Sequence, residues 1–181
     1  MKKESIKSHL SAYSIKQKRQ TTINHAFASA IAPVDKYDLK RLVEALRLLG
    51  EKDPDGELTC IYCGKPAETW DHLHGLVKDA KPSGYGHQLG NLVPCCKECN
   101  SRKGAKDWEI YLKNEVSEQT ALEQKQKLIA SYCDRYVGRV NSELLVEKSP
   151  GDLNRYWEIK EHIINLMKEA DEIAKKLREV E

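Results

Sequence analysis

Two pairs of cysteines are the part of this 181-residue chain whose chemistry is easiest to define. Cys60 and Cys63 form one Cys-x2-Cys pair, and Cys96 and Cys99 form a second, with residues 64–95 between them. Four thiolates in two such pairs make the closed tetrahedral shell of a structural zinc site, which leaves no position for water or substrate. The spacing therefore predicts one structural Zn2+ ion.

The cysteine next to the second pair leaves one alternative open, because Cys95 and Cys99 are also spaced as a possible ligand pair. We prefer Cys96, whose two-residue spacing to Cys99 repeats that of the first pair. Cys95 and Cys133 are then expected to be small buried hydrophobic residues.

A second set of polar residues lies between the cysteine pairs or directly after them: Asp71, His72, Asn91 and Asn100. An imidazole with a pKa of about 6.5 can accept a proton from water at neutral pH, so His72 is the candidate general base. The carboxylate of Asp71 and the carbonyl oxygen of Asn100 are ligand types that suit Mg2+ or Mn2+. A cation held by these two residues keeps positions open for water and phosphate oxygens, which suits hydrolysis of a phosphodiester bond.

In the order of these motifs, residues 58–112 resemble the zinc-bearing branch of the HNH endonucleases, also called ββα-metal or His-Me finger endonucleases. The resemblance rests on the combination of the two cysteine pairs, the Asp-His dipeptide, the Asn-Leu step and the Cys-Asn ending. It implies an α+β fold, in which a small zinc-stabilised ββα-metal core is flanked by N- and C-terminal α-helices. It also implies that the Asp-His pair lies at a strand end, where the chain loops out before returning through a second strand to a helix.

The resemblance assigns a role to each polar residue. Asp71 corresponds to the first metal ligand, His72 to the base, Asn91 to the residue that braces the loop and orients the base, and Asn100 to the last metal ligand. The family often has His or Glu at the first position and His at the last. Because both residues here are oxygen donors, the departure favours Mg2+ or Mn2+ over Zn2+ as the catalytic cation.

Four further basic or imidazole side chains lie near these residues in the sequence: His74, His87, Arg102 and Lys103. Lys103 follows Asn100 by three residues and would share its helix face, so we expect Lys103, together with Arg102, to contact a phosphate beside the cut. The alternative is a solvated helix surface. His74 could join the site directly, but an exposed or supporting position is the more common one, and the loop that carries His87 could read DNA or be a surface excursion.

Positive charge is concentrated near the N-terminus. The net charge is +2, but residues 1–49 carry ten positive and four negative side chains, whereas residues 117–181 carry eleven and thirteen. Lys16, Lys18 and Arg19 lie among Ser, Gln and Thr residues, which is typical of a segment that follows a phosphate backbone. A solvated terminus that aids solubility is an equal alternative.

The remaining sequence predicts helices around the cysteine-rich segment. We expect a basic helical region at 1–59, the HNH core at 60–112 and a helical region at 113–181. In the first region, good helix formers run from Ala26 to Ala32, and a second helix begins at Asp35 or Asp38 and stops at Gly50.

Two helices are expected in the last region, at 118–137 and at 153–180, with Asp152 capping the second. Apolar residues of the final helix recur in steps of three and four, which is the spacing of a coiled-coil seam. The seam could pair two copies of the chain, or it could pack on the chain's own 118–137 helix.

Together these features predict a metal-dependent DNA endonuclease, most simply a site-specific enzyme of the type II restriction kind that acts on double-stranded DNA as a homodimer. One alternative is an HNH nuclease of a mobile element, a phage or a repair system, and another is a non-catalytic zinc module that binds nucleic acid. The polar N-terminus and the absence of any apolar run of about 20 residues predict a cytoplasmic protein without a membrane segment.

Overall fold

A computed structural model describes residues 3–137 and 149–179 of the chain. The chain forms two compact units. We call Ala28–Ser142 the central unit, and Met1–Phe27 together with Glu143–Glu181 the terminal unit. The cysteine pairs and the helices immediately before and after them all belong to the central unit.

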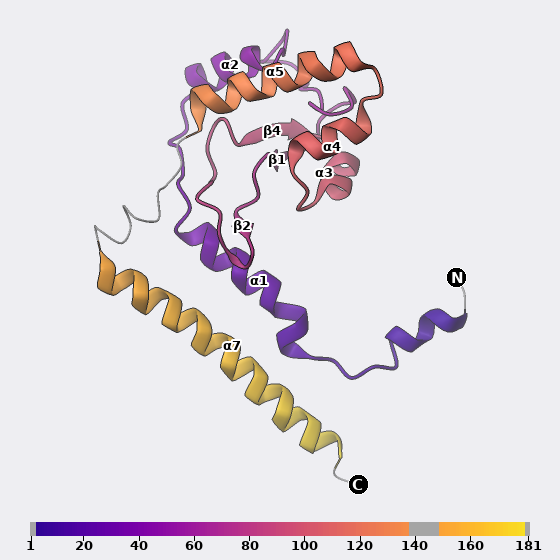
Figure 1. The fold of residues 1–181 in the computed structure, drawn as a ribbon, viewed down its shortest axis with the longest axis vertical. Helices are drawn as coiled ribbons and strands as arrows, with labels where there is room; N and C mark the ends of the chain where they lie inside the picture. Colours follow the sequence, from indigo (N-terminus) through magenta and orange to yellow (C-terminus); the bar gives the residue numbers. More distant parts are fainter. Residues whose placement is uncertain (1–2, 138–148, 180–181) are drawn as a thin grey trace. The chain divides into compact units, whose positions relative to one another are not determined.

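Two antiparallel strands and a short helix form the middle of the central unit (Figure 1). Strand β1 (Thr69–His72) pairs with β4 (Leu92–Cys95), with Asp71 opposite Val93 and His72 opposite Leu92. Helix α3 (Lys97–Lys103) follows β4 directly and contacts β1. This ββα arrangement with helices before and after it confirms the predicted α+β fold.

The connection between β1 and β4 contains a second small sheet. Strands β2 (Val77–Lys78) and β3 (Lys81–Pro82) pair antiparallel. The two residues between them, Asp79 and Ala80, both have positive φ angles, of 52° and 60°. The chain therefore leaves β1, turns back through a tight hairpin and then passes through residues 83–91 before entering β4.

Three helices complete the central unit. Helices α2 (Leu39–Leu48) and α5 (Gln119–Tyr136) lie side by side, and α4 (Trp108–Glu115) packs against α5 (Figure 1). Together with the strands they enclose a core whose fully buried side chains are mostly large; these include Tyr62, Leu73, Val93, Tyr111, Leu112, Ile129 and Tyr132. A small domain with only two central strands therefore builds its core largely from helices and the cysteine-bearing segments.

Both ends of α2 agree with the sequence prediction. The Asp38 carboxylate accepts a hydrogen bond from the amide of Arg41 at 3.1 Å, which satisfies one of the unpaired N–H groups of the first turn. Gly50 follows the helix with a φ of +91°, a conformation that glycine adopts without steric cost. The predicted 118–137 helix is also confirmed, as α5.

The terminal unit consists of a short 3-10 helix, η1 (Lys3–Ser8), and two α-helices, α1 (Ile15–Ala30, which continues into the central unit) and α7 (Pro150–Arg178). The Asp171 carboxylate of α7 accepts hydrogen bonds from the Ser14 hydroxyl and from the amides of Ile15 and Lys16. It therefore caps the N-terminus of α1 across a tertiary contact.

The other end of the α1–α7 contact is aromatic. The Tyr156 hydroxyl donates to the carbonyl of Phe27 at 2.8 Å, and their rings are 4.9 Å apart. Because Tyr156 meets the end of α1 and Asp171 meets its beginning, the two helices run antiparallel.

The start of α7 corrects one expectation. We predicted that this helix begins at residue 153 with Asp152 as its cap, but it already begins at Pro150 and Ser149 is its N-cap. Proline is well suited to the first turn because its missing N–H would have no helical partner there. Among the described residues, no helix combines the length and the apolar character needed to cross a membrane.

Candidate functional site

The four predicted zinc ligands come together in the central unit. Their sulfur atoms all lie within 4.8 Å of one another, and the Sγ atoms of Cys63 and Cys96 are 3.7 Å apart. Zinc–sulfur bonds of 2.3 Å in a tetrahedron require sulfur separations of roughly 3.8 Å. Cys60, Cys63, Cys96 and Cys99 therefore have the donor set and spacing of a structural zinc site.

Local backbone geometry aims these thiols at one point. In the first pair, a tight turn is closed by a hydrogen bond from the amide of Gly64 to the carbonyl of Cys60, and Gly64 has a φ of +74°. In the second pair, Cys96 is the N-cap of α3 and its sulfur accepts from the amide of Cys99. Cys96 therefore contributes a sulfur to the cluster and also caps helix α3.

The remaining two cysteines lie outside the cluster. Cys95 is fully buried, with its sulfur 3.9 Å from that of Cys60, and its hydrogen bond lowers the pKa of Cys60 to about 4. Cys133 is half-buried on α5, where its thiol donates to the carbonyl of Gly90 at 3.3 Å. The cluster of four sulfurs contains Cys96 and not Cys95, in agreement with the preference for Cys96.

Two cations lie around the thiolate cluster. The guanidinium of Arg102 is 3.9 Å from the Cys99 sulfur and pairs with Glu115. Lys125 of α5 donates to the carbonyls of Ile61 and Tyr62, both at 2.8 Å, and so holds the first cysteine turn against the helix. Both positive charges would offset the negative charge that four thiolates leave around a bound Zn2+ ion. Lys125 was missed from sequence, since nothing in its spacing marks it.

Asp71 lies between α3 and the first cysteine turn. Its carboxylate accepts a hydrogen bond from the Tyr62 hydroxyl at 2.7 Å and pairs with the Lys103 ammonium at 3.1 Å. The Lys103 ammonium also donates to the carbonyl of His72 at 2.7 Å. The side chains of Asp71 and Lys103 are only 6% and 2% exposed, so each charge relies on the other to offset its loss of hydration.

These contacts place Lys103 differently from our expectation. We predicted that Lys103 and Arg102 would contact a phosphate beside the cut. The described contacts of the Lys103 ammonium are internal and tie α3 to β1, whereas Arg102 is half-exposed beside the zinc cluster. Lys103 therefore acts on the position of Asp71 and of the end of β1.

Asn100 lies one helical turn before Lys103 on α3, so the two residues share a face, as expected. The Oδ1 atom of Asp71 is 3.4 Å from the Lys103 ammonium, which is longer than the contacts of Oδ2 with Tyr62 and Lys103. A carboxylate offers about four acceptor positions in all. Asp71 and Asn100 offer carboxylate and amide oxygens, which are the ligand types that suit a hard divalent cation.

His72 is the last residue of β1, at the strand end from which the chain enters the connection to β4. Its Nε2 atom is 3.0 Å from the Nδ1 atom of His87, with the two rings inclined at 70°. Burial, followed by the electrostatic effect of the neighbouring His87, lowers the pKa of His72 below the usual 6.5. A lowered pKa favours the neutral ring that a general base requires.

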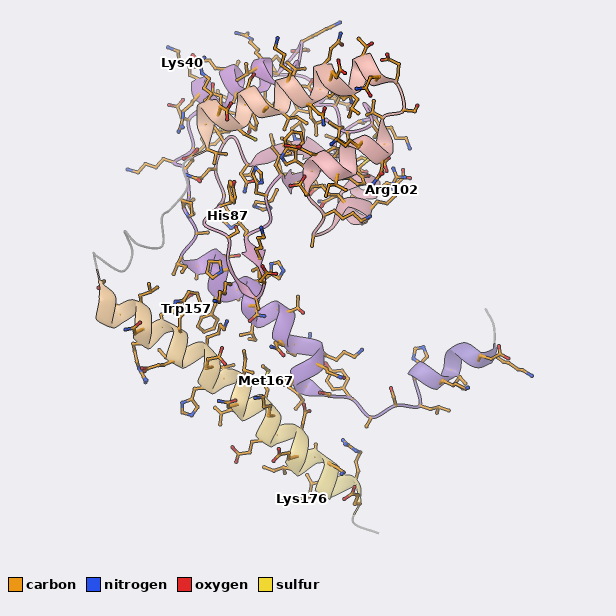
Figure 2. All side chains as sticks on the ribbon, in the orientation of Figure 1. Lys40, His87, Arg102, Trp157, Met167 and Lys176 are labelled. Carbon is orange, nitrogen blue, oxygen red and sulfur yellow. The ribbon has the colours of Figure 1, made fainter. Side chains whose placement is uncertain are left out.

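Residues from the start of the central unit hold His87 in place. The amide of His87 donates to the carbonyl of Pro33 at 2.9 Å, and the amide of Asp35 donates to the carbonyl of His87 at 3.1 Å. A Cβ atom at Gly86 would lie 1.9 Å from the Pro33 carbonyl oxygen, so only glycine permits this approach. In Figure 2, His87 and Arg102 lie on opposite sides of the central strands.

Asn91 makes the contacts of a bracing residue. Its side chain is fully buried and accepts from the amide of His74 at 2.8 Å. Its amide group donates to the carbonyls of His74 and Gly86. Asn91 thus joins the segment that follows His72 to the segment that precedes His87. The His74 ring itself stacks on Tyr85, with centroids 4.1 Å apart.

The predicted basic residues of the N-terminal region belong to α1 in the terminal unit. Lys18 and Arg19 are exposed, and Lys16 is half-buried at the end capped by Asp171. Helix α1 contains no acidic residue at all, so its charged side chains are all positive.

Comparison with known proteins identifies the segment that contains these sites. The family model described as HNH endonuclease matches residues 60–106, from the first zinc cysteine to just beyond α3. Neither the curated proteins nor the solved structures gave a match.

Proposed function

Since residues 60–106 form an HNH endonuclease domain, we propose that this chain is a metal-dependent DNA endonuclease that hydrolyses phosphodiester bonds. The observation that carries the proposal is the environment of His72. Its imidazole is half-buried, has a lowered pKa, and meets His87 at the strand end where the family places its base.

In the proposed reaction, His72 removes a proton from the attacking water. The water oxygen then bonds to phosphorus while the bond to the leaving oxygen breaks. For the Nδ1 atom of His72 to accept this proton, its Nε2 must carry the ring hydrogen and donate it to Nδ1 of His87. The 3.0 Å separation of these two nitrogens is short enough for this hydrogen bond.

We propose that Asp71 and Asn100 hold the catalytic cation, Mg2+ or Mn2+, which when bound neutralises charge on the reacting phosphate. Lys103 positions this part of the site, because its ammonium contacts both the Asp71 carboxylate and the His72 carbonyl. Asn91 and His87 orient the base. The zinc cluster is separate from the reaction and stabilises the fold.

Basic side chains are the proposed contacts to the DNA backbone. Lys16, Lys18 and Arg19 lie on a helix without acidic residues, which favours contact with phosphates. Arg102 remains a proposed phosphate contact through the exposed half of its side chain. Double-stranded DNA is the proposed substrate.

A homodimer is the assembly we propose for cutting both strands. Ile159, Leu166 and Ile173 of α7 follow one another at seven-residue steps and are 41%, 54% and 50% exposed. A stripe with this spacing can pair with the same stripe of a second copy. Replacing Leu166 and Ile173 by Lys should convert a dimer into a monomer in sedimentation equilibrium; a wild-type monomer would contradict the proposal.

A site-specific enzyme of the type II restriction kind is our preferred biological role. A nuclease of a mobile element, phage or repair system would share the chemistry and differ in its target. The cysteine cluster also suits a reducing compartment such as the cytoplasm, where thiols remain available to zinc.

The test is to incubate the purified protein with long duplex DNA and Mg2+ and to sequence the fragment ends. Discrete ends that share a short motif are expected, whereas scattered ends would contradict site specificity. Full cleavage after removal of Mg2+ and Mn2+ would contradict the assigned cation. DNA binding without any cleavage would instead support the non-catalytic zinc module.

A further inference from the structure

We propose that a pocket beside β1 receives one unstacked nucleobase of the DNA, and that it prefers a base with an exocyclic amino group. The inference rests on the proposed nuclease function, because it places this base next to the phosphate that is cut. It assigns the base preference of the enzyme, in part, to a site within the central unit.

The pocket has a volume of about 340 Å³. This is near the lower end of the roughly 300–1,000 Å³ of small-molecule sites, so the pocket suits one planar ring system and not a helix or a duplex. Its lining combines aromatic, acidic and aliphatic side chains, among them Asp35, Tyr37, Asp38, Trp70, His87 and Leu92.

Two aromatic side chains of the lining are unusually exposed. Tyr37 is 80% exposed and Trp70 is 41% exposed. Both belong to the central unit, where most large side chains of this kind are buried in the core. Aromatic faces exposed beside a nucleic-acid site are suited to stacking on bases, whatever their sequence.

The charges of the lining favour a base over a phosphate. Asp35 and Asp38 are the acidic residues of the lining, and Lys36 is its one basic residue besides His87. Asp35 already accepts from the amide of Leu89 and pairs with Arg41, and Asp38 caps α2, but a carboxylate has about four acceptor positions. Carboxylates repel phosphates and accept hydrogen bonds from an amino group such as N4 of cytosine.

The position of the pocket connects it to the proposed reaction. His87 lines the pocket and also contacts His72. Trp70 lies two residues before His72 on β1, on the same face of the strand, and Leu92 of the lining lies opposite His72 on β4. A base in the pocket is therefore part of a nucleotide close to the cut.

Binding of short single strands tests the inference without any cleavage. We would measure the affinity of the zinc-loaded protein for labelled oligo(dC) and oligo(dU) in buffer without Mg2+ or Mn2+, because these strands differ at C4 in having an amino group or an oxygen. Oligo(dC) should bind about tenfold more tightly. Tyr37→Ala should weaken the binding of both strands. Asp38→Asn keeps a helix-capping side chain and should reduce the difference in affinity between oligo(dC) and oligo(dU) to less than about threefold.

Tyr13→Ala is the matched control, because Tyr13 is also an exposed tyrosine, at 54%, but belongs to the terminal unit. It should leave both affinities unchanged. Equal binding of the two strands by the wild type, or no effect of Tyr37→Ala, would overturn the inference. If the wild type then still cuts duplex DNA, the nuclease proposal stands; if the preference for oligo(dC) is found without any cleavage, the pocket stands and the nuclease proposal fails. A pocket that binds an apolar peptide of another protein would show no difference between the strands.

Discussion

The Nε2 atom of His72 lies 3.0 Å from the Nδ1 atom of His87, a residue of the loop that connects the two central strands. If His87 orients the base, His87→Ala should lower kcat by roughly 10- to 100-fold with little change in KM. His87→Asn should restore much of the rate, because its side-chain oxygen can accept near the position of Nδ1. Exposed His25 provides the control variant His25→Ala. An unchanged rate in His87→Ala would rule out the orienting role.

The pH dependence of the rate follows from the lowered pKa of His72. A base acts only when it is neutral, so the rate should fall as the pH decreases through this pKa and stay level above it. The midpoint should lie below the usual 6.5, and His87→Ala should move it upwards because removal of the neighbouring ring exposes His72 to water, and burial is the largest cause of the lowered pKa. The measurement is the single-turnover rate between pH 5 and pH 8, for which buffers of about constant ionic strength are required. A wild-type midpoint above neutral pH would contradict this environment.

Removal of the Lys103 ammonium should destabilise the central unit. Lys103→Met leaves the buried Asp71 carboxylate without its cation, which should lower the free energy of unfolding by about 3 kcal/mol. Lys106→Met is the control, since Lys106 is exposed and contacts only the Arg102 carbonyl among the hydrogen bonds of the described residues. Denaturant unfolding of the zinc-loaded proteins measures the free energy of unfolding of both variants. A loss as small as that of the control would mean that the pair contributes little to stability.

Zinc should bind in a ratio of one ion per chain and hold the central unit together. Cys96→Ser removes a zinc ligand while its hydroxyl can still cap α3, so it should reduce the zinc content and increase amide exchange in β1, β4 and α3. Cys133→Ser should keep its zinc, because Cys133 lies outside the cluster and a serine hydroxyl can still donate to the Gly90 carbonyl. Elemental analysis with hydrogen exchange decides between these outcomes; full zinc content in Cys96→Ser would contradict the ligand set.

The sequence predicted those features that depend on residues near one another in the chain. The zinc ligands could be identified because spacing within each cysteine pair decides where the sulfurs point. Asp38 and Gly50 marked the ends of α2 for the same reason, since caps act on the adjacent turn. The predicted start of α7 was wrong because proline and glycine, which usually interrupt helices, are tolerated in its first turn.

Features that depend on tertiary contacts could not be predicted. His87 reaches His72 only because Pro33 and Asp35 hold its main chain, and no local pattern connects these segments. The length of α1 was underestimated because its cap, Asp171, comes from another helix. We expected the Lys103 side chain to contact a phosphate, but its ammonium is buried in an ion pair with the Asp71 carboxylate.

The most direct test of the account is cleavage of plasmid DNA by His72→Ala in the presence of Mg2+, measured together with DNA affinity. Loss of the imidazole should abolish cleavage while the affinity for DNA and the zinc content stay as in the wild type, because His72 contacts neither the zinc ligands nor the basic residues of α1 in the described structure. Cleavage by His72→Ala at the wild-type rate would contradict the assignment of His72 as the base.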